Sequence, residues 1–283
     1  MTTMGHTAKM IVDSWNIHGS PECWRELAKS DADIALVQEA RKPPDDVSVE
    51  VDDAEWLTTG EGLKRSWRTA VARLSDRQAV AWRPCVSLPD ARVGELASSR
   101  PGTIAVAEVT PKGEEPITLV SVYVAWENPD ARTGSSWILS DASAHRLISD
   151  ISLLIGQQKR HRIIVAGDWN LLHGYGENGS QYWRDRYATV FDRMAALGLP
   201  FVGPQAPHGQ KVPAELWPSE LPPDSENVPT YRTRKNDPAS ATRQLDFVFA
   251  SESIAARLKT RALNEPENWG SSDHCRIRIE LTE

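Results

Sequence analysis

The chain has 283 residues, of which 40% are hydrophobic and 25% are charged, and its net charge is −7. This composition is typical of a globular protein with an ample core, and no apolar run approaches the length of a membrane span. The acidic balance argues against a protein that coats nucleic acid. It does not argue against an enzyme acting on nucleic acid, because bound divalent cations can offset acidic residues around a site.

Two strands and a helix are predicted near the start of the chain. Residues 9–15 and 33–39 are apolar runs that indicate buried strands. Residues 21–30 have helical spacing, and Pro21 suits the first turn of a helix. Residues 41–66 are polar and rich in Pro or Asp, so we expect a loop there with a short strand or helix.

Four further strands are predicted as two adjacent pairs. Ser75 and Asp76 join the strands of the first pair, and the turn-like sequence KGEEP joins those of the second. We expect the two strands of each pair to lie side by side. The four strands cover residues 69–74, 77–84, 102–111 and 117–125.

The second half of the chain contains helices, strands and one long irregular segment. A helix is predicted at 141–157, and another at 184–197 that ends at Gly198. Residues 200–229 hold eight of the 19 prolines, and a loop this long in a compact domain is usually functional or disordered. The strands of this half lie within residues 163–170, 243–251 and 275–281.

The irregular order of strands and helices indicates the fold class. Hairpin-like pairs among crossovers favour two packed sheets flanked by helices over one doubly wound sheet. The sequence shows neither an internal repeat nor a linker. We therefore predict an α/β protein with one domain over residues 1–283, in which a Pro-rich loop covers about 200–229.

The cysteines and the first residues of the chain indicate a compartment. Three widely spaced cysteines fit neither a disulfide framework nor a zinc motif. The opening sequence MTTMGHTAKMIVDSW has no apolar region of a signal peptide. We therefore expect a protein of the reducing cytoplasm, and no sequence feature indicates a protein partner.

Polar side chains stand where the predicted strands end. The run IIVAGDWN at 163–170 closes a buried strand with Asp168 and Asn170, which share one side of the chain if the extended geometry persists. Such strand ends assemble ligand-binding groups in α/β proteins, although Asp and Asn are also common in turns. Asp246 lies inside an apolar run, where a buried carboxylate needs a partner. The full set is Asn16, Glu39, Tyr123, Asp168, Asn170, Asp246, Asp273 and His274.

Taken singly, these residues have structural explanations, such as a cap for Asn16 or core packing for Tyr123. Together, the order SWNIHG, LVQE, YV, GDWN, QLDFVFAS and SSDH resembles the endonuclease/exonuclease/phosphatase superfamily. This superfamily of metal-dependent phosphoesterases includes DNase I-like nucleases and apurinic repair endonucleases. The resemblance runs from about residue 10 to 281, and it implies a four-layer sandwich of two packed mixed β-sheets flanked by helices.

The resemblance implies a divalent metal site. Glu39 matches the metal-binding glutamate of the superfamily, and Asn16 and Asp273 match residues near the same ion. Hard oxygen ligands suit Mg²⁺ or Mn²⁺. The cofactor is therefore expected to be Mg²⁺, with Mn²⁺ as the other candidate.

The resemblance also implies catalytic roles for the remaining residues. Asp168 would align or deprotonate the attacking water, and Asn170 would donate to a phosphate oxygen. His274 would contact the scissile phosphate, with Asp246 fixing its tautomer and raising its basicity. Tyr123 would donate to the phosphate or to the leaving oxygen. Which of Asp168 and His274 is the general base stays open.

Substrate choice is expected in the loops at about 125–140, 173–183 and 200–242. Aromatic and basic residues there suit a groove for nucleic acid, or else a solvated surface loop. His18 stands where the repair endonucleases carry an aspartate near the metal, and it could face phosphate or a softer ion, or be a polar loop residue. The candidate substrate-binding residues are His18, Trp183, Arg232, Arg234 and Lys235.

These residues predict a divalent-metal-dependent phosphodiester hydrolase, with a nuclease on DNA, or on RNA, as the first interpretation. The first alternative is a phosphatase or phosphodiesterase acting on a small-molecule or lipid phosphoester, because fold and catalytic core do not name the substrate. The second alternative is a non-catalytic binding module on the same fold. Retention of the complete set of Glu, Asp and His positions argues against that module.

Overall fold

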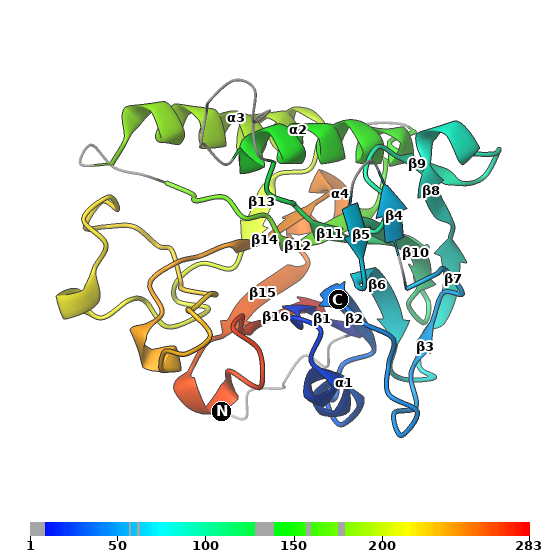
Figure 1. The fold of residues 1–283 in the computed structure, drawn as a ribbon, viewed down its shortest axis with the longest axis horizontal. Helices are drawn as coiled ribbons and strands as arrows, with labels where there is room; N and C mark the ends of the chain where they lie inside the picture. The colour runs from blue at the N-terminus through cyan, green and yellow to red at the C-terminus, as the bar shows by residue number, and fades with distance from the viewer. Residues whose placement is uncertain (1–8, 57, 61–62, 128–138, 157–159, 175–178) are drawn as a thin grey trace.

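The computed structural model describes residues 9–56, 58–60, 63–127, 139–156, 160–174 and 179–283. Two six-stranded mixed sheets pack together, with helices on the outer faces (Figure 1). One helix, α1 (Pro21–Ala28), covers one sheet, and the pair α2 (Ser140–Ile151) and α3 (Gln181–Ala196) covers the other. The predicted α/β sandwich of two mixed sheets flanked by helices is confirmed.

The first sheet has the strand order β15-β16-β1-β2-β6-β3. Its β1 and β2 are parallel, and its other neighbouring strands are antiparallel. The parallel pair places the carboxyl ends of both strands at one edge, with Asn16 opposite Gln38. The strands are β1 (Met10–Asn16), β2 (Ile34–Ala40), β3 (Glu50–Val51), β6 (Arg68–Arg73), β15 (Leu258–Leu263) and β16 (Arg276–Leu281).

The second sheet has the strand order β13-β14-β12-β11-β10-β7. Its one parallel pair, β11 and β12, places Tyr123 opposite Asp168, and the antiparallel partner of β12 places Asp246 opposite Asp168. In each sheet, therefore, polar residues lie at the carboxyl ends of the two parallel strands. The strands are β7 (Ala79–Arg83), β10 (Ile104–Thr110), β11 (Ile117–Tyr123), β12 (Ile163–Asp168), β13 (Phe201–Gly203) and β14 (Asp246–Ala250).

Smaller elements lie outside the two six-stranded sheets. They are the pairs β4 (Thr58–Gly60) with β5 (Leu63–Arg65) and β8 (Cys85–Ser87) with β9 (Leu96–Ser98), and the short helix α4 (Glu252–Ala255). Turns of 3₁₀-helix lie at Leu88–Asp90, Ser152–Leu154, Ala214–Leu216, Pro238–Ser240 and Pro266–Asn268.

Three apolar layers hold the sandwich together. The layer between the sheets contains Leu36 and Val71 from one sheet and Leu119 from the other. Beneath α2 and α3, Trp169 packs edge-on against Phe249 with ring centroids 4.8 Å apart. Because burying apolar surface is the main favourable term in folding, these layers fix the sheets and therefore the strand ends that carry the polar residues.

The predicted strands 69–74 and 77–84 do not pair, so this part of the sequence interpretation is wrong. β6 pairs with β2 and β3 in the first sheet, whereas β7 pairs with β10 in the second. The chain changes sheets at Ser75, whose hydroxyl donates to Asp33 Oδ1 at 2.7 Å. β6 and β7 both place apolar side chains in the layer between the sheets, so period-two alternation does not show which sheet a strand joins. The second predicted pair is confirmed, because β10 and β11 are antiparallel neighbours.

The helices differ from the sequence prediction at their ends. The helix predicted at 141–157 ends at Ile151 and continues as a 3₁₀ turn to Leu154, and residue 157 lies outside the described residues. The helix predicted from 184 begins at Gln181, because the Ser180 side chain caps it by accepting from the Trp183 N–H. None of the helices in the described part of the chain is long and apolar enough to cross a membrane.

The Pro-rich segment 200–229 is ordered by side chains from outside it. Asn264 accepts from the Gln210 N–H and donates to the carbonyls of Gln210 and Pro229, all at 2.8–3.0 Å. Gln244 donates to the Pro204 carbonyl and accepts from the Val228 N–H. These side-chain amides replace the backbone ladder that prolines cannot form, so the loop packs against the sandwich.

Candidate active site

The predicted residues meet at the carboxyl ends of the two parallel strand pairs. Asn16 and Glu39 end β1 and β2, and Asp168 ends β12 beside Tyr123 of β11. Asp246 opens β14. Asp273 and His274 lie just before β16. Asn170 follows the end of β12 by two residues. All eight residues therefore lie at strand ends or in the short segments beside them, where the sheet register brings them together.

His274 lies between two buried carboxylates. Its Nδ1 is 2.8 Å from Asp246 Oδ2, and its Nε2 is 3.8 Å from Asp168 Oδ2. All three residues are at most 4% exposed. The Thr230 hydroxyl donates to the same Asp246 oxygen at 2.6 Å and accepts from the Asp246 N–H. The Asp246 carboxylate is therefore held in place and orients the imidazole.

The protonation of this group follows from its surroundings. Burial lowers the pKa of His274, but the Asp246 and Asp168 carboxylates outweigh burial and raise the pKa to about 10. Burial, with the Asp246 and Glu39 charges, raises the pKa of Asp168 to about 7 against the opposing effect of His274. At neutral pH, His274 is therefore the cation of this group, and the pKa of Asp168 lies close to the ambient pH.

Asn16 connects the two sheets at the site. Its side-chain N–H₂ donates to Glu39 Oε1 at 3.1 Å and to Asp168 Oδ2 at 3.0 Å. Its Oδ1 accepts from the backbone N–H of His18 at 3.1 Å. Because Asn16 is only 1% exposed, the amide fixes the distance between the Glu39 and Asp168 carboxylates.

Asn170 supports Asp168 in the structure. Its backbone N–H donates to Asp168 Oδ1 at 3.0 Å, and its side chain donates to Asp168 Oδ2 at 3.2 Å and to the Val124 carbonyl at 3.0 Å. Both amide hydrogens therefore have protein acceptors. Donation from Asn170 to a phosphate oxygen stays a prediction, and it requires one of these bonds to exchange.

Three residues of the site have left-handed backbone conformations. His18, Glu39 and Asn170 have φ values of 46°, 48° and 49°, and no other non-glycine residue in the described ranges has positive φ. Such conformations cost free energy in residues with a side chain and persist where the surrounding structure enforces them. The strain is confined to the residues that carry the predicted chemistry.

Two aromatic rings border the site. Tyr123 packs edge-on against Trp67 with ring centroids 4.8 Å apart. Tyr231 lies 5.0 Å from the His274 ring and forms an isolated β-bridge with that residue. Tyr231 opens the basic sequence YRTRK and was expected among the aromatic residues of the substrate loops, whereas Thr230 was not identified from the sequence. Thr230 lies in a segment without periodic pattern, and its position directly before YRTRK was the available signal.

Three of the predicted substrate-binding residues lie in the loop before β14. The Arg232 guanidinium donates to the carbonyls of Ser272, Arg234 and Asn236 at 2.8–3.1 Å, and its N–H donates to the Asp273 carbonyl. Arg232 therefore fastens its loop to the segment that carries Asp273, while Arg234 and Lys235 are exposed. Substrate binding by these residues stays a prediction.

Trp183 lies on α3, outside the cluster around His274. Its ring stacks on Tyr187 at 5.5 Å, and the Arg186 guanidinium lies 5.8 Å from it. Most of the predicted loop 125–140 and part of the loop 173–183 lie outside the described residues. Substrate contacts by Trp183 stay a prediction.

Two donor groups in the site suit a divalent cation. One is the buried group of Asp168, Asp246 and His274, which offers two carboxylates and an imidazole within a small sphere. The other is the predicted pair of Glu39 and Asp273, whose free oxygens both face His18 Nδ1, at 3.6 and 3.7 Å. Carboxylate oxygens are hard ligands, so the donors present fit Mg²⁺ or Mn²⁺.

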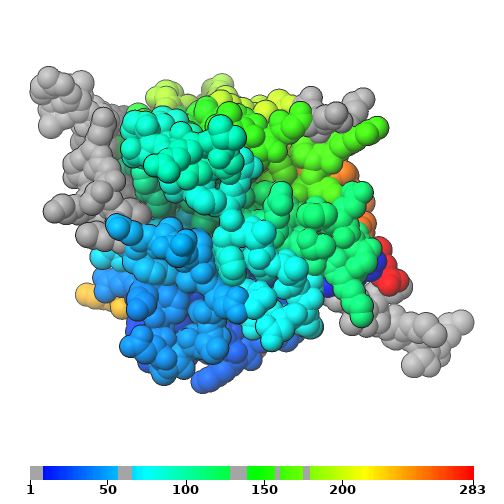
Figure 2. Space-filling model, turned by 90° about the vertical axis from the view of Figure 1, so that its right-hand side faces the viewer, coloured from blue at the N-terminus to red at the C-terminus, as the bar shows by residue number. Residues whose placement is uncertain are grey.

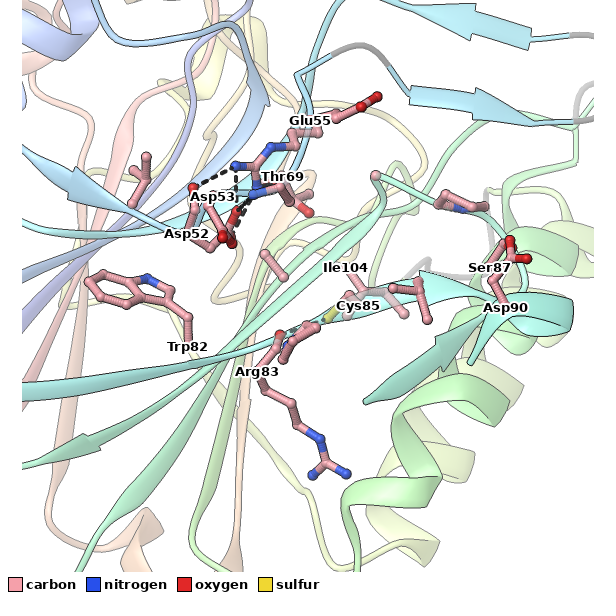
Figure 3. Close-up of a pocket in the computed structure, with 18 residues that line it drawn as sticks. Asp52, Asp53, Glu55, Thr69, Trp82, Arg83, Cys85, Ser87, Asp90 and Ile104 are labelled. Atoms are coloured by element: carbon pink, nitrogen blue, oxygen red, sulfur yellow. Dashed lines mark hydrogen bonds and ion pairs between the residues drawn. The ribbon is translucent and has the colours of Figure 1, made fainter. Parts of the chain in front are cut away.

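A separate cavity of about 870 Å³ opens between β3 and β7, the outer strands of the two sheets. Figure 2 faces this side of the molecule, and Figure 3 shows the lining, in which the Arg68 guanidinium donates to both Asp52 oxygens at 2.6 and 3.1 Å. Four carboxylates and two arginines line it. This charge balance disfavours an anionic phosphoester. None of the eight predicted site residues is in the lining, so the candidate active site is the strand-end cluster.

Comparison with known proteins gives a family and a fold. A sequence model described as the endonuclease/exonuclease/phosphatase family matches residues 14–274. No curated protein matches the chain. The endonuclease domain of TRAS1, a telomere-specific non-LTR retrotransposon, is similar in structure at 20% identity and a TM-score of 0.59, covering 96% of this chain and 98% of that one.

Two further solved structures are also similar. The AP endonuclease LMAP from Leishmania major has 16% identity and a TM-score of 0.60, covering 97% of this chain and 88% of that one. The 3′ phosphatase NExo from Neisseria, bound to a product DNA hairpin, has 16% identity and a TM-score of 0.55, covering 97% and 100%. At such identities these likenesses show a shared fold.

Proposed function

The chain belongs to the endonuclease/exonuclease/phosphatase family of phosphoesterases, and from that premise we propose that it is a divalent-metal-dependent nuclease. The observation that carries the proposal is the buried Asp246–His274–Asp168 group, joined through Asn16 to Glu39. The likeness to nucleases and to a DNA-bound 3′ phosphatase supports a nucleic-acid substrate. We propose DNA as the first substrate to test.

The protonation states assign roles within this proposal. His274 carries a proton at neutral pH and stabilises negative charge that develops on the phosphate, with Asp246 holding its orientation. Asp168, with its pKa near 7, accepts the proton of the attacking water. A divalent ion held by Glu39 and Asp273 would neutralise the phosphate. The proposal therefore places the general base at Asp168 rather than at His274.

One observation favours a second candidate, a phosphodiesterase or phosphatase on a small phosphoester. The basic cluster 232–235 presents only Arg234 and Lys235 to solvent, because Arg232 is occupied by backbone carbonyls. Long nucleic acids are held by several phosphate contacts. A short footprint of this kind suits a small or terminal phosphoester.

Hydrolysis with Mg²⁺ or Mn²⁺ tests the two candidates together. Plasmid DNA, single-stranded DNA, RNA and small phosphoesters should be compared for the wild type, Asp168→Asn and His274→Gln. Glu115→Gln, an exposed carboxylate at the turn before β11, is the matched control. Loss of polymer cleavage in both site variants but not in the control supports the nuclease. Activity confined to small phosphoesters supports the second candidate instead.

Hydrolysis in none of these assays would contradict both candidates and favour a binding module.

The single-domain organisation and the cytoplasmic location stay predictions from the sequence.

A further inference from the structure

His18 brings a nitrogen to the place where two carboxylates converge. Its Nδ1 lies 3.6 Å from Glu39 Oε2 and 3.7 Å from Asp273 Oδ2. The other oxygen of each carboxylate is occupied, because Asn16 donates to Glu39 Oε1 at 3.1 Å and Ser272 donates to Asp273 Oδ1 at 3.2 Å. The two oxygens that accept no hydrogen bond from the described residues therefore face the same imidazole nitrogen.

The two distances from His18 Nδ1 to the carboxylate oxygens match the spacing of ligands around an ion and exceed the length of a hydrogen bond. A hydrogen bond between nitrogen and oxygen is about 2.7–3.2 Å long, which is shorter than either distance. Atoms bound to one cation at about 2.0–2.3 Å lie roughly 3–4.5 Å from each other. Both measured distances fall in that range.

The Asp273 carboxylate independently requires a cation. Its side chain is 10% exposed, and in the described part of the chain neither it nor Glu39 has a lysine or arginine partner. A buried carboxylate without a close cationic partner is costly, and among the described residues the hydrogen bond to the Asp273 carboxylate comes from the neutral Ser272 hydroxyl. Among the described side chains, only His18 forms a close ion pair with either carboxylate, and the charge of His274 acts on Asp273 from a longer range.

We propose that His18 is a nitrogen ligand of the divalent ion, together with Glu39 and Asp273, and that it shifts the site's preference from Mg²⁺ toward Mn²⁺. The inference rests on the proposed function only in placing a divalent ion at this cluster. Mg²⁺ strongly favours oxygen ligands and water, whereas imidazole suits the first-row transition metals. His18 and Glu39 both have left-handed backbone, and their side chains approach to 3.6 Å between Nδ1 and Oε2.

The second donor group provides the competing location. An ion bound by Asp168, Asp246 and His274 would take its nitrogen from His274. In the structure, His274 Nδ1 is engaged with Asp246 at 2.8 Å, which leaves only Nε2 for such an ion. The two locations differ in which histidine supplies the nitrogen, so nitrogen coupling to a bound ion separates them.

The test uses the full chain with Mn²⁺ alone and no substrate. Electron spin echo modulation from ¹⁴N should appear in the wild type, persist in His274→Gln and disappear in His18→Asp. Direct binding titrations should show His18→Asp still binding Mn²⁺. The ratio of Mn²⁺ to Mg²⁺ affinity should fall by about tenfold in that variant, because an oxygen ligand replaces nitrogen.

Several results would overturn the proposal. They are ¹⁴N modulation that survives in His18→Asp, modulation that disappears in His274→Gln, Mn²⁺ bound in the wild type without nitrogen coupling, and no Mn²⁺ binding. His18→Asn, with circular dichroism on every variant, guards against misfolding as the cause of a loss. Because no substrate is present, an inactive protein with His18-dependent coupling upholds this inference and refutes the nuclease, and an active protein without coupling does the reverse.

Discussion

Glu114 and Asp168 are carboxylates near opposite ends of β11, and the side chains around them carry opposite charge. Glu114 precedes the strand and is surrounded by Lys9, Arg162 and Arg257, all within 2.8–3.2 Å. Asp168 lies beside the last residue of β11, among other carboxylates and a single histidine. Hydrogen bonds from Arg257 and Lys9 lower the pKa of Glu114 to about 2, whereas burial raises the pKa of Asp168 to about 7.

The difference separates a stabilising charge from a functional one. An ionised carboxylate with three cationic partners stabilises the folded protein. A buried carboxylate near two other carboxylates destabilises the folded protein when it ionises. Strongly perturbed groups gather at functional sites because chemistry needs a pKa near the working pH. The same sheet therefore carries a structural ion cluster at one end and a reactive cluster at the other.

The largest expected effect comes from Asp168→Asn. We expect the rate of phosphodiester hydrolysis to fall by at least about 10³-fold, because the variant cannot accept the proton of the attacking water. Because the folded pKa of Asp168 is raised, its ionisation costs stability as pH rises from about 4 to about 7. The metal-free variant should therefore unfold at no lower temperature than the wild type at pH 8. A clearly lower unfolding temperature there would contradict this assignment.

A smaller loss is expected for Asp246→Asn. Hydrolysis should fall by about 10²-fold, because His274 loses the carboxylate that orients it. The pKa of His274, measured by NMR titration of the metal-free protein, should fall below the wild-type value of about 10, since Asp246 is the largest effect that raises it. An unchanged titration would show that Asp246 does not hold the charge on the imidazole.

Glu114→Gln tests the other end of the strand. The free energy of unfolding at pH 7 should fall by about 1–2 kcal/mol. This loss is smaller than for a fully buried ion-pair network, because the cluster is partly exposed. Because the folded pKa is lowered, this contribution is complete above about pH 4.5 and is lost as pH falls through about 2. Hydrolysis should stay within about twofold of the wild type. A large loss of activity would remove the contrast with Asp168.

The smallest effect is expected from the exposed pair Arg234→Ala and Lys235→Ala. Each lost phosphate contact should weaken DNA binding a few-fold and reduce the salt slope by about one. Lys112→Ala, an exposed lysine in the turn between β10 and β11, is the matched control. Equal salt slopes for the wild type and the double variant would show that these residues do not contact phosphate.

The sequence predicted the strand ends well because each motif lies on a strand or directly beside one. Asp168, Asp246 and His274 meet through sheet register, and apolar runs that end in polar residues predict such strands. The pairing of β6 and β7 could not be predicted, since alternation does not record which sheet a strand joins. β15 was missed because its buried positions are filled only by Thr260 and Ala262.

The loop contributions were beyond sequence reasoning for a different reason. Thr230 and Tyr231 reach the site only through hydrogen bonds and bridges formed in the folded protein. Arg232 was expected to face substrate, but its donors are directed at three backbone carbonyls. Such choices depend on loop conformation, which neither periodicity nor composition encodes.

Cleavage of a DNA oligonucleotide by the full chain, with Mn²⁺ before and after chelation and with Glu39→Gln alongside, tests the central claim most directly. The account predicts cleavage that stops on chelation, returns when Mn²⁺ is restored and is absent in the folded Glu39→Gln variant. Cleavage that persists without divalent cations, or that Glu39→Gln retains in full, would contradict a metal-dependent nuclease at this site.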